Sequence, residues 1–234
     1  MAGSFLSVLV TRLPLGESVI ITRSVCRYCR HALGPLDLVP LLSWLLLRGR
    51  CRHCGHDIPL IYPALEAASV IVAVWSALTL SGWLVWAGCG LGWGLLALAV
   101  IDRRHFILPD VLTLPLIPIG LAVTYGIDPD RVPDAALGAL LGYGAFRSIA
   151  GLYRRLRGKE GLGAGDAKLL AVGGAWTSWA YLPDIILWAA LTGLLVAVMS
   201  LRSRSRYSAP MAFGPHLALA IWVVWLHGLR PEVV

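Results

Sequence analysis

The feature that most constrains this chain is the alternation of long apolar segments with short loops rich in arginine. Of its 234 residues, 58% are hydrophobic and 14% are charged, and the mean hydropathy is +0.74. A water-soluble domain of this length would need more surface charge, whereas apolar runs of about 20 residues suit helices that cross a lipid bilayer. The sequence therefore predicts an all-α polytopic membrane protein with about seven to eight transmembrane helices.

The apolar runs divide the chain into three parts. Residues 1–11 are expected to form a partial first membrane helix, because the apolar stretch 2–10 is shorter than a bilayer-spanning helix. Residues 12–58 are polar, basic and rich in cysteine, which predicts a small extramembrane domain. Residues 59–234 form the membrane-embedded domain. Its spans are expected at 60–80, 83–101, 107–125, 135–152, 169–181, 185–201 and 211–226.

Positive charge is distributed unevenly between the two sides of the bilayer. Crossing the membrane at each apolar run places four loops on one side, namely 12–58, 102–106, 153–168 and 202–210. These loops hold 17 of the 20 lysines and arginines, which predicts that they are cytoplasmic. The net charge of +7 follows from this orientation, so we expect no nucleic-acid partner.

Four cysteines in the extramembrane domain have the spacing of a metal site. Cys26 and Cys29 form one C-x2-C pair, and Cys51 and Cys54 form a second pair after twenty-one further residues. This spacing predicts a structural zinc site with four thiolate ligands. His53 and His56 are possible substitutes, but four sulfurs already complete a tetrahedron. In the same domain, the apolar stretch 36–47 predicts an interfacial or re-entrant helix.

A glycine-rich segment, residues 160–168, precedes the apolar run 169–181. Asp166 in this segment is a candidate catalytic residue, although an aspartate is also common as a helix cap. A cap does not explain the glycines at positions 161, 163 and 165, which allow another part of the backbone to approach Asp166 closely.

Asp102 ends an apolar run on the same predicted face as Asp166. Two carboxylates brought together cannot both ionise easily, so the pair can supply a general base and a general acid, as in aspartic proteases. Two alternatives stay open: that Arg103 or Arg104 pairs with Asp102 while Lys168 pairs with Asp166, or that Asp110 takes the catalytic role.

Two further side chains are candidates for a functional role. Glu66 lies inside the first full span, where an ionisable residue is a functional candidate. His105 follows Asp102 closely, either to tune it or simply as a loop histidine in water.

Taken together, these motifs resemble those of the type IV prepilin peptidases, bifunctional bacterial enzymes of the GxGD intramembrane aspartyl protease group. The matching segments are Gly3-Ser4-Phe5-Leu6-Ser7-Val8 with Arg12-Leu13-Pro14, the two C-x2-C pairs, Tyr62-Pro63-Ala64-Leu65-Glu66, Ile101-Asp102 with Leu108-Pro109-Asp110, Glu160-Gly161-Leu162-Gly163-Ala164-Gly165-Asp166 with Lys168, and Phe213-Gly214-Pro215.

The resemblance implies that Asp102 and Asp166 are catalytic and that Gly163, Gly165 and Lys168 support the catalytic loop. It implies cleavage of prepilins or pseudopilins after the short basic leader, at the cytoplasmic face of the bacterial inner membrane. It also implies N-methylation of the new terminus with S-adenosylmethionine by the cysteine-bearing domain. The residues that bind this methyl donor are unknown from the sequence, which has no Rossmann-type glycine signature. The alternatives are a peptidase without methylation and a non-catalytic zinc-bearing assembly factor.

Overall fold

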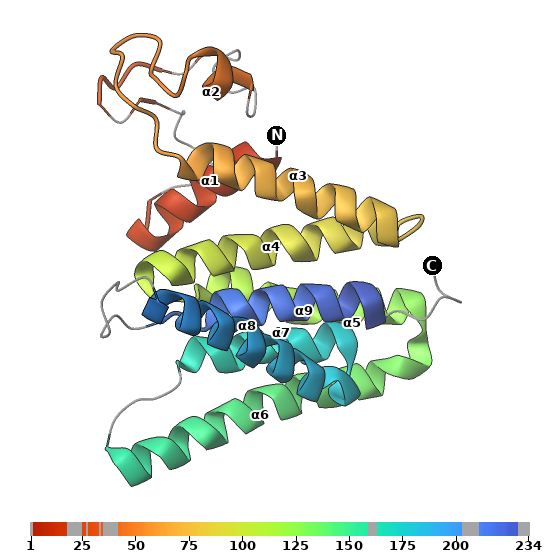
Figure 1. Ribbon diagram of the computed structural model, residues 1–234. Coiled ribbons are helices and arrows are strands. Elements are labelled where there is room, and N and C mark those ends of the chain that lie inside the picture. The colour runs from red at the N-terminus through yellow and green to blue at the C-terminus, as the bar shows by residue number, and fades with distance from the viewer. Residues whose placement is uncertain are drawn as a thin grey trace. The chain divides into compact units, whose positions relative to one another are not determined.

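The computed structural model describes residues 2–17, 25–26, 28–32, 34, 42–158, 163–202 and 211–228. These residues form helices joined by turns (Figure 1), and their only β-type pairings are two isolated bridges, Val25–Ala32 and Arg50–Asp57. The all-α prediction is therefore confirmed. The chain divides into two compact units, Met1–Trp75 and Ser76–Val234, which are described separately.

The first unit holds α1 (Ala2–Arg12), α2 (Leu42–Leu46) and most of α3 (Ile61–Thr79). A Cβ atom on Gly3 would lie 2.6 Å from the Cα atom of Glu66, so glycine is required for α1 to lie this close to α3. The Glu66 carboxylate accepts a hydrogen bond of 3.0 Å from the hydroxyl of Ser4. The helix expected over 36–47 is seen as α2, and its first part, residues 36–41, lies outside the described residues.

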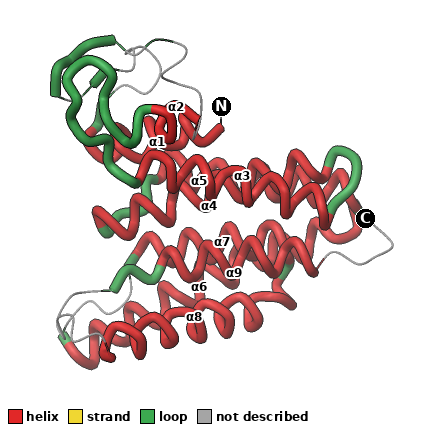
Figure 2. The backbone as a smooth tube through the Cα atoms, turned by 45° about the horizontal axis from the view of Figure 1, so that its top comes forward, coloured by secondary structure: helices red, strands yellow, loops and turns green. Residues whose placement is uncertain are grey.

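The second unit is a bundle of helices with α7 in contact with four others (Figure 2). The helices are α4 (Leu84–His105), α5 (Asp110–Ile127), α6 (Val132–Arg157), α7 (Ala164–Thr177), α8 (Leu182–Arg202) and α9 (Gly214–Gly228). Helix α7 contacts α5, α6, α8 and α9, and almost every residue from Asp166 to Trp176 is buried. The shortest helix of this unit is thus its core.

Within the described residues, five helices are long and apolar enough to cross a membrane: α3, α4, α5, α6 and α8. The other two expected spans, 169–181 and 211–226, correspond to α7 and α9, which have 14 and 15 residues and are shorter than a typical spanning helix. Hydropathy cannot separate such buried helices from lipid-facing ones, because both need apolar side chains.

Glycines bring α6 against α7. A Cβ atom on Gly138 would lie 2.7 Å from the carbonyl carbon of Ser178, and one on Gly142 would lie 2.8 Å from the carbonyl oxygen of Leu170. Real Cβ atoms do not approach backbone this closely, so the two helices can pack at this distance only where side chains are missing. The contacts also show that α6 and α7 run antiparallel, since residue numbers fall along α6 as they rise along α7.

Trp176 joins α7 to two other helices. Its indole Nε1 donates a hydrogen bond of 2.8 Å to the carbonyl oxygen of Leu116 on α5. Its ring meets that of Trp225 on α9 edge to face, with ring centroids 5.2 Å apart. These contacts hold α5, which contains Pro115 and Pro118, in the bundle.

Two helix boundaries differ from the predicted ones at the residues of most interest. Helix α4 continues to His105, so Asp102 lies in its last turns instead of in a loop. Helix α7 begins at Ala164, so Asp166 lies in its first turn. Acidic residues at a helix N-terminus and basic residues at a C-terminus complement the helix dipole, which explains both extensions.

Candidate active site

Asp102 is held near the C-terminal end of α4 by the start of α9. Its side chain is buried, with 7% exposure, and its Oδ2 atom accepts a hydrogen bond of 3.0 Å from the backbone N–H of Gly214. A Cβ atom on Gly214 would come within 2.5 Å of the same oxygen. Glycine at this position is therefore what allows the backbone to reach the carboxylate.

Asp166 is buried at the start of α7, with 9% exposure, and two glycines shape its surroundings. A Cβ atom on Gly163 would lie 3.1 Å from its Oδ2 atom, so Gly163 leaves room beside the carboxylate. A Cβ atom on Gly165 would lie 2.9 Å from the Cβ atom of Leu108, so Gly165 lets the connection between α4 and α5 pack against α7. Residues 160–162 lie outside the described residues.

Asp102 lies near the end of α4 and Asp166 in the first turn of α7, and Leu108, in the connection that follows α4, packs against Gly165 beside Asp166. Helix α9 contacts both α4 and α7, and so brings together two carboxylates that are far apart in the sequence. Among the described residues, Asp102 and Asp166 are the only charged side chains that are buried. The bundle thus buries a carboxylate pair at one end, and neither member has an ion-pair partner in the part of the chain that the structure describes.

Lys168 and Asp110 form an ion pair through Nζ and Oδ1, with 28% and 53% of their side chains exposed. This contact contradicts the alternative in which Lys168 pairs with Asp166, whereas the catalytic role of Asp102 or Asp110 stays a prediction. Lys168 lies with Asp110 and not with Asp166, as expected for residues two apart on a helix. Asp110 lies outside the buried pair. The bases next to Asp102, Arg103 and Arg104, are exposed, and so is His105.

The four cysteines form a compact cluster in the first unit. The Sγ atoms of Cys26, Cys29, Cys51 and Cys54 all lie within 4.8 Å of one another. The turn that holds each C-x2-C pair is closed by an equivalent backbone hydrogen bond. The N–H of Cys26 donates to the carbonyl oxygen of His31 at 2.9 Å, and the N–H of Cys51 donates to that of His56 at 2.8 Å. Backbone N–H groups of Cys29 and then Tyr28 lower the pKa of the Cys26 thiol to about 6. Although the His56 backbone N–H opposes the change, burial and the other cysteines raise the pKa of the Cys54 thiol to about 11.

The histidines of this domain stack on other rings. The ring of His53 lies 3.6 Å from that of His31, and the ring of His56 lies 3.3 Å from that of Tyr28, centroid to centroid. Each stack joins one cysteine pair to the other. The group of side chains able to hold a metal therefore contains the four sulfurs and no histidine, within the described residues.

The fold and the site define a polytopic α-helical membrane protein with a buried aspartate pair and a tetracysteine domain. Comparison with family models agrees with this class. Residues 1–80 match the bacterial peptidase A24 N-terminal domain, and residues 89–198 match the type IV leader peptidase family. The chain belongs to the type IV leader peptidase family.

Curated relatives are similar over most of the chain. A prepilin leader peptidase/N-methyltransferase of Aeromonas hydrophila is 38% identical over 254 residues, covering 97% of this chain and 88% of the relative. One from Pseudomonas aeruginosa is 38% identical over 253 residues, covering 97% and 87%. One from Burkholderia pseudomallei is 43% identical over 209 residues, covering 88% and 67%. No solved structure is significantly similar to the chain.

Two contacts of the site were absent from the sequence analysis. The segment Phe213-Gly214-Pro215 stood out as a motif, but its hydrogen bond to Asp102 did not. The packing of Leu108 on Gly165 was also missed. The sequence marks these residues only by placing them in short motifs. Membership of a motif does not predict which two segments are in contact in the fold.

Proposed function

We propose that this protein is an intramembrane aspartic endopeptidase that removes the short basic leader of type IV prepilins or pseudopilins. The observation that carries the proposal is the burial of Asp102 and Asp166, on helices that α9 contacts in common and that Leu108 links through its packing against Gly165. Membership of the type IV leader peptidase family supports it, and so do the names of the curated relatives.

In the proposed mechanism, the two carboxylates share one proton. The Gly214 N–H complements a negative charge on Asp102, which favours Asp102 as the base and Asp166 as the acid. Asp102 then takes a proton from water as the water oxygen attacks the scissile carbonyl. Asp166 gives its proton to the leaving amine as the C–N bond breaks. Gly163 leaves the space beside Asp166 in which the peptide lies.

The charge distribution supports a site at the cytoplasmic face of the inner membrane. Arg103 and Arg104 follow Asp102 directly, and the last turn of α6, which precedes α7, holds Arg154, Arg155 and Arg157. Basic residues gather on the cytoplasmic side of membrane proteins. A peptidase with this orientation meets its substrate leader before the leader leaves the cytoplasm.

The cysteine cluster suits a structural zinc ion. With Zn–S bonds of about 2.3 Å in a tetrahedron, neighbouring sulfurs are roughly 3.8 Å apart, and the Sγ atoms of Cys26 and Cys54 are 3.9 Å apart. Four sulfurs leave no open position for substrate, so the ion would hold the domain 12–58 together.

We further propose that the protein N-methylates the new terminal residue, as the names of the relatives indicate for them. S-adenosylmethionine would supply the methyl group, and the cysteine-bearing domain is the proposed place of this second activity. Two weaker possibilities are a peptidase that lacks methylation and a non-catalytic zinc-bearing assembly factor.

One experiment separates these functions. The purified protein and its Asp102→Asn and Asp166→Asn variants are incubated with a prepilin and S-adenosylmethionine, and the products are analysed by mass spectrometry. We expect leader removal and a mass increase of one methyl group with the wild type, and an uncleaved prepilin with both variants. Cleavage without the added methyl group would favour the peptidase alone. An uncleaved prepilin with folded wild type would favour the assembly factor.

A further inference from the structure

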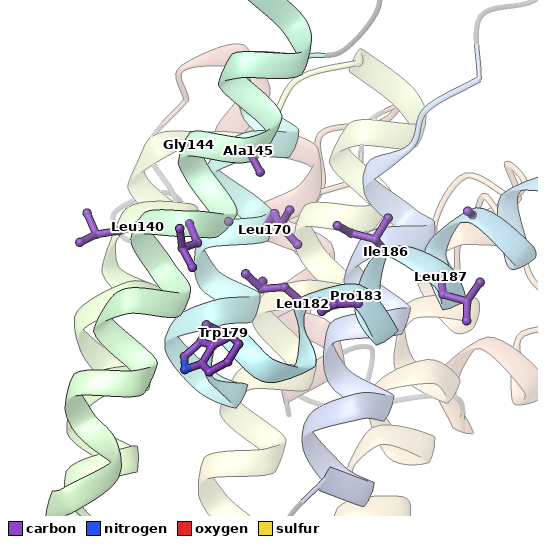
Figure 3. Close-up of a pocket in the computed structure, with 12 residues that line it drawn as sticks. Leu140, Gly144, Ala145, Leu170, Trp179, Leu182, Pro183, Ile186 and Leu187 are labelled. Atoms are coloured by element: carbon purple, nitrogen blue, oxygen red, sulfur yellow. The ribbon is translucent and has the colours of Figure 1, made fainter.

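A pocket of about 270 Å³ lies at the end of the second unit that is remote from Asp102 and Asp166. Helix α7 carries Asp166 in its first turn and ends at this pocket, so about 20 Å separates the two sites. The larger groove between α6 and α8, of about 740 Å³, is apolar except for the indole nitrogen of Trp179 (Figure 3). The smaller pocket also has charged, hydroxyl and aromatic side chains in its lining, and it is therefore the cavity suited to a polar ligand.

Three helices end at this pocket. Its lining includes Ile127, Thr177 and Gly228, the last residues of α5, α7 and α9. Each helix C-terminus carries a partial negative charge of about half a unit, and the three together favour a positively charged ligand. The N-terminus of α6, which has the opposite polarity, carries Asp134 in its first turn, and this exposed carboxylate also lines the pocket. Backbone and side-chain charges therefore favour a cation.

Aromatic rings form the buried wall of the pocket. Trp176 and Trp225 are 4% and 2% exposed, and their rings meet edge to face. Tyr181 lines the pocket with them, and its hydroxyl donates a hydrogen bond of 3.1 Å to the carbonyl oxygen of Gly228. The π faces of tryptophan and tyrosine attract cations, and aromatic cages bind ammonium ligands in this way. The rings and the carboxylate of Asp134 thus favour the same kind of ligand, an ammonium group.

The pocket also has a positive charge at its mouth. Arg131 lines it, and 39% of this side chain is exposed. Its Nε atom forms an ion pair of 3.1 Å with Asp128, and a guanidinium has four further N–H donors. These planar donors match the oxygens of a phosphate group. Arg131 and Asp134 therefore suit a ligand in which a phosphate lies close to an ammonium group.

Exposed tryptophans place the pocket at the depth of lipid headgroups. Trp179 and Trp83 are 46% and 50% exposed. Trp179 follows Ser178 of the lining, and its indole donates a hydrogen bond of 3.1 Å to Asp134. The Trp83 ring lies against the end of α5, where a Cβ atom on Gly126 would be 3.2 Å from it. Tryptophans in such positions are typical of the membrane–water interface. A lipid headgroup is therefore within reach of the pocket.

We propose that the pocket binds the headgroup of phosphatidylethanolamine, a phospholipid in which a short linker joins an ammonium group to the phosphate. The ammonium group binds Asp134 and the aromatic rings, and the phosphate binds Arg131. Oδ1 of Asp134 already accepts the Trp179 N–H, so Oδ2 is the acceptor for the ammonium group. A choline headgroup has no N–H to donate and a glycerol headgroup has no positive charge, so neither matches the pocket. With the orientation proposed above, the lipid belongs to the outer leaflet.

Native mass spectrometry of the purified protein in detergent tests the proposal, with phosphatidylethanolamine, phosphatidylcholine and phosphatidylglycerol of identical acyl chains. We expect the wild type to bind phosphatidylethanolamine at least about fivefold more tightly than the other two lipids. Asp134→Asn keeps an acceptor for the Trp179 N–H but removes the charge, and it should abolish this preference. The matched control is Asp130→Asn, which makes the same charge change in a nearby aspartate outside the pocket lining. It should keep the preference.

A second variant, Ala180→Leu, fills the mouth of the pocket at an exposed position of the lining. Phosphatidylethanolamine should raise the midpoint of thermal unfolding of the wild type, and should raise that of Ala180→Leu less. An equal rise in both proteins, or equal binding of the three lipids by the wild type, overturns the proposal. So does a preference that survives in Asp134→Asn or is lost in Asp130→Asn. Free phosphoethanolamine that binds as tightly as the lipid would show a soluble ligand and also overturn it. None of these measurements requires cleavage, so their outcome is independent of the peptidase activity.

Discussion

The backbone N–H of Gly214 donates a hydrogen bond of 3.0 Å to the Asp102 carboxylate across 112 positions of the chain. This bond ties the end of α4 to the start of α9 and orients one of the two buried aspartates. Gly214→Ala places a Cβ atom 2.5 Å from the accepting oxygen and must displace it. Loss of a hydrogen bond to a charged group costs about 1.5–3 kcal/mol, so we expect cleavage about 10- to 100-fold slower. The steady-state rate on a prepilin checks this, with Gly151→Ala, a helical glycine without neighbours, as the unaffected control.

Asp102→Asn and Asp166→Asn should each lower the cleavage rate by about 1000-fold or more, because general acid–base catalysis alone supplies 100- to 10,000-fold. Asp110→Asn is the matched control, since Asp110 is half exposed and lies outside the buried pair. Its rate should stay within a few-fold of the wild type. Loss of activity in Asp110→Asn with full activity in Asp102→Asn would exchange their roles.

The ion pair between Lys168 and Asp110 should contribute little to stability. Exposed pairs are worth about 0.2–1 kcal/mol, and both side chains are partly solvated. We expect Lys168→Asp to lower the midpoint of thermal unfolding slightly and the double variant Lys168→Asp with Asp110→Lys to restore it. Scanning at low and high salt checks the electrostatic origin, because screening should remove the difference. Lack of restoration in the double variant would mean that Lys168 acts through another contact.

Removal of the metal should affect the two units differently. Replacing Cys51 by Ser breaks a tetracysteine cluster that lies in the first unit, whereas the aspartate pair lies in the second. We expect zinc in the purified wild type and none in the variant, measured by elemental mass spectrometry. Leader removal should persist in the variant while methylation is lost. Zinc retained at the wild-type level in Cys51→Ser would contradict a four-thiolate site.

Close packing of α6 against α7 predicts a stability cost at Gly138. Its added Cβ atom in Gly138→Ala would lie 2.7 Å from a backbone carbon of Ser178, and overpacking of this kind costs about 1–3 kcal/mol. The midpoint of thermal unfolding in detergent should fall. Gly151→Ala on the same helix meets no atom and should leave the midpoint unchanged or slightly higher.

The parts of this molecule that were predictable from sequence are those with local signals. Hydropathy predicted the helical bundle. The spacing of Cys26, Cys29, Cys51 and Cys54 predicted the cluster, because two ligands separated by two residues on a tight turn can share one metal. The basic loops also predicted one membrane face for Asp102 and Asp166, and this stays a prediction.

Contacts between distant segments carried no such signal. The partner of Lys168 is Asp110, fifty-eight positions away, and only the packing of α5 on α7 selects it. The C-terminal end of α4 and the start of α7 were also not predicted, because polar residues in the terminal turn of a helix have the same composition as a loop. Helix α7 was read as an ordinary span because a helix buried by protein and one immersed in lipid have the same composition.

The enclosure of α7 has a consequence for biosynthesis. The helix that carries Asp166 packs against α8 and α9, which leave the ribosome after it, and Asp102 receives its hydrogen bond from the first residue of α9. A nascent chain that stops short of Gly214 contains both aspartates but lacks the backbone N–H that orients the Asp102 carboxylate. Proteolytic competence therefore arises only once translation has passed that glycine, and a prematurely terminated product would be inert.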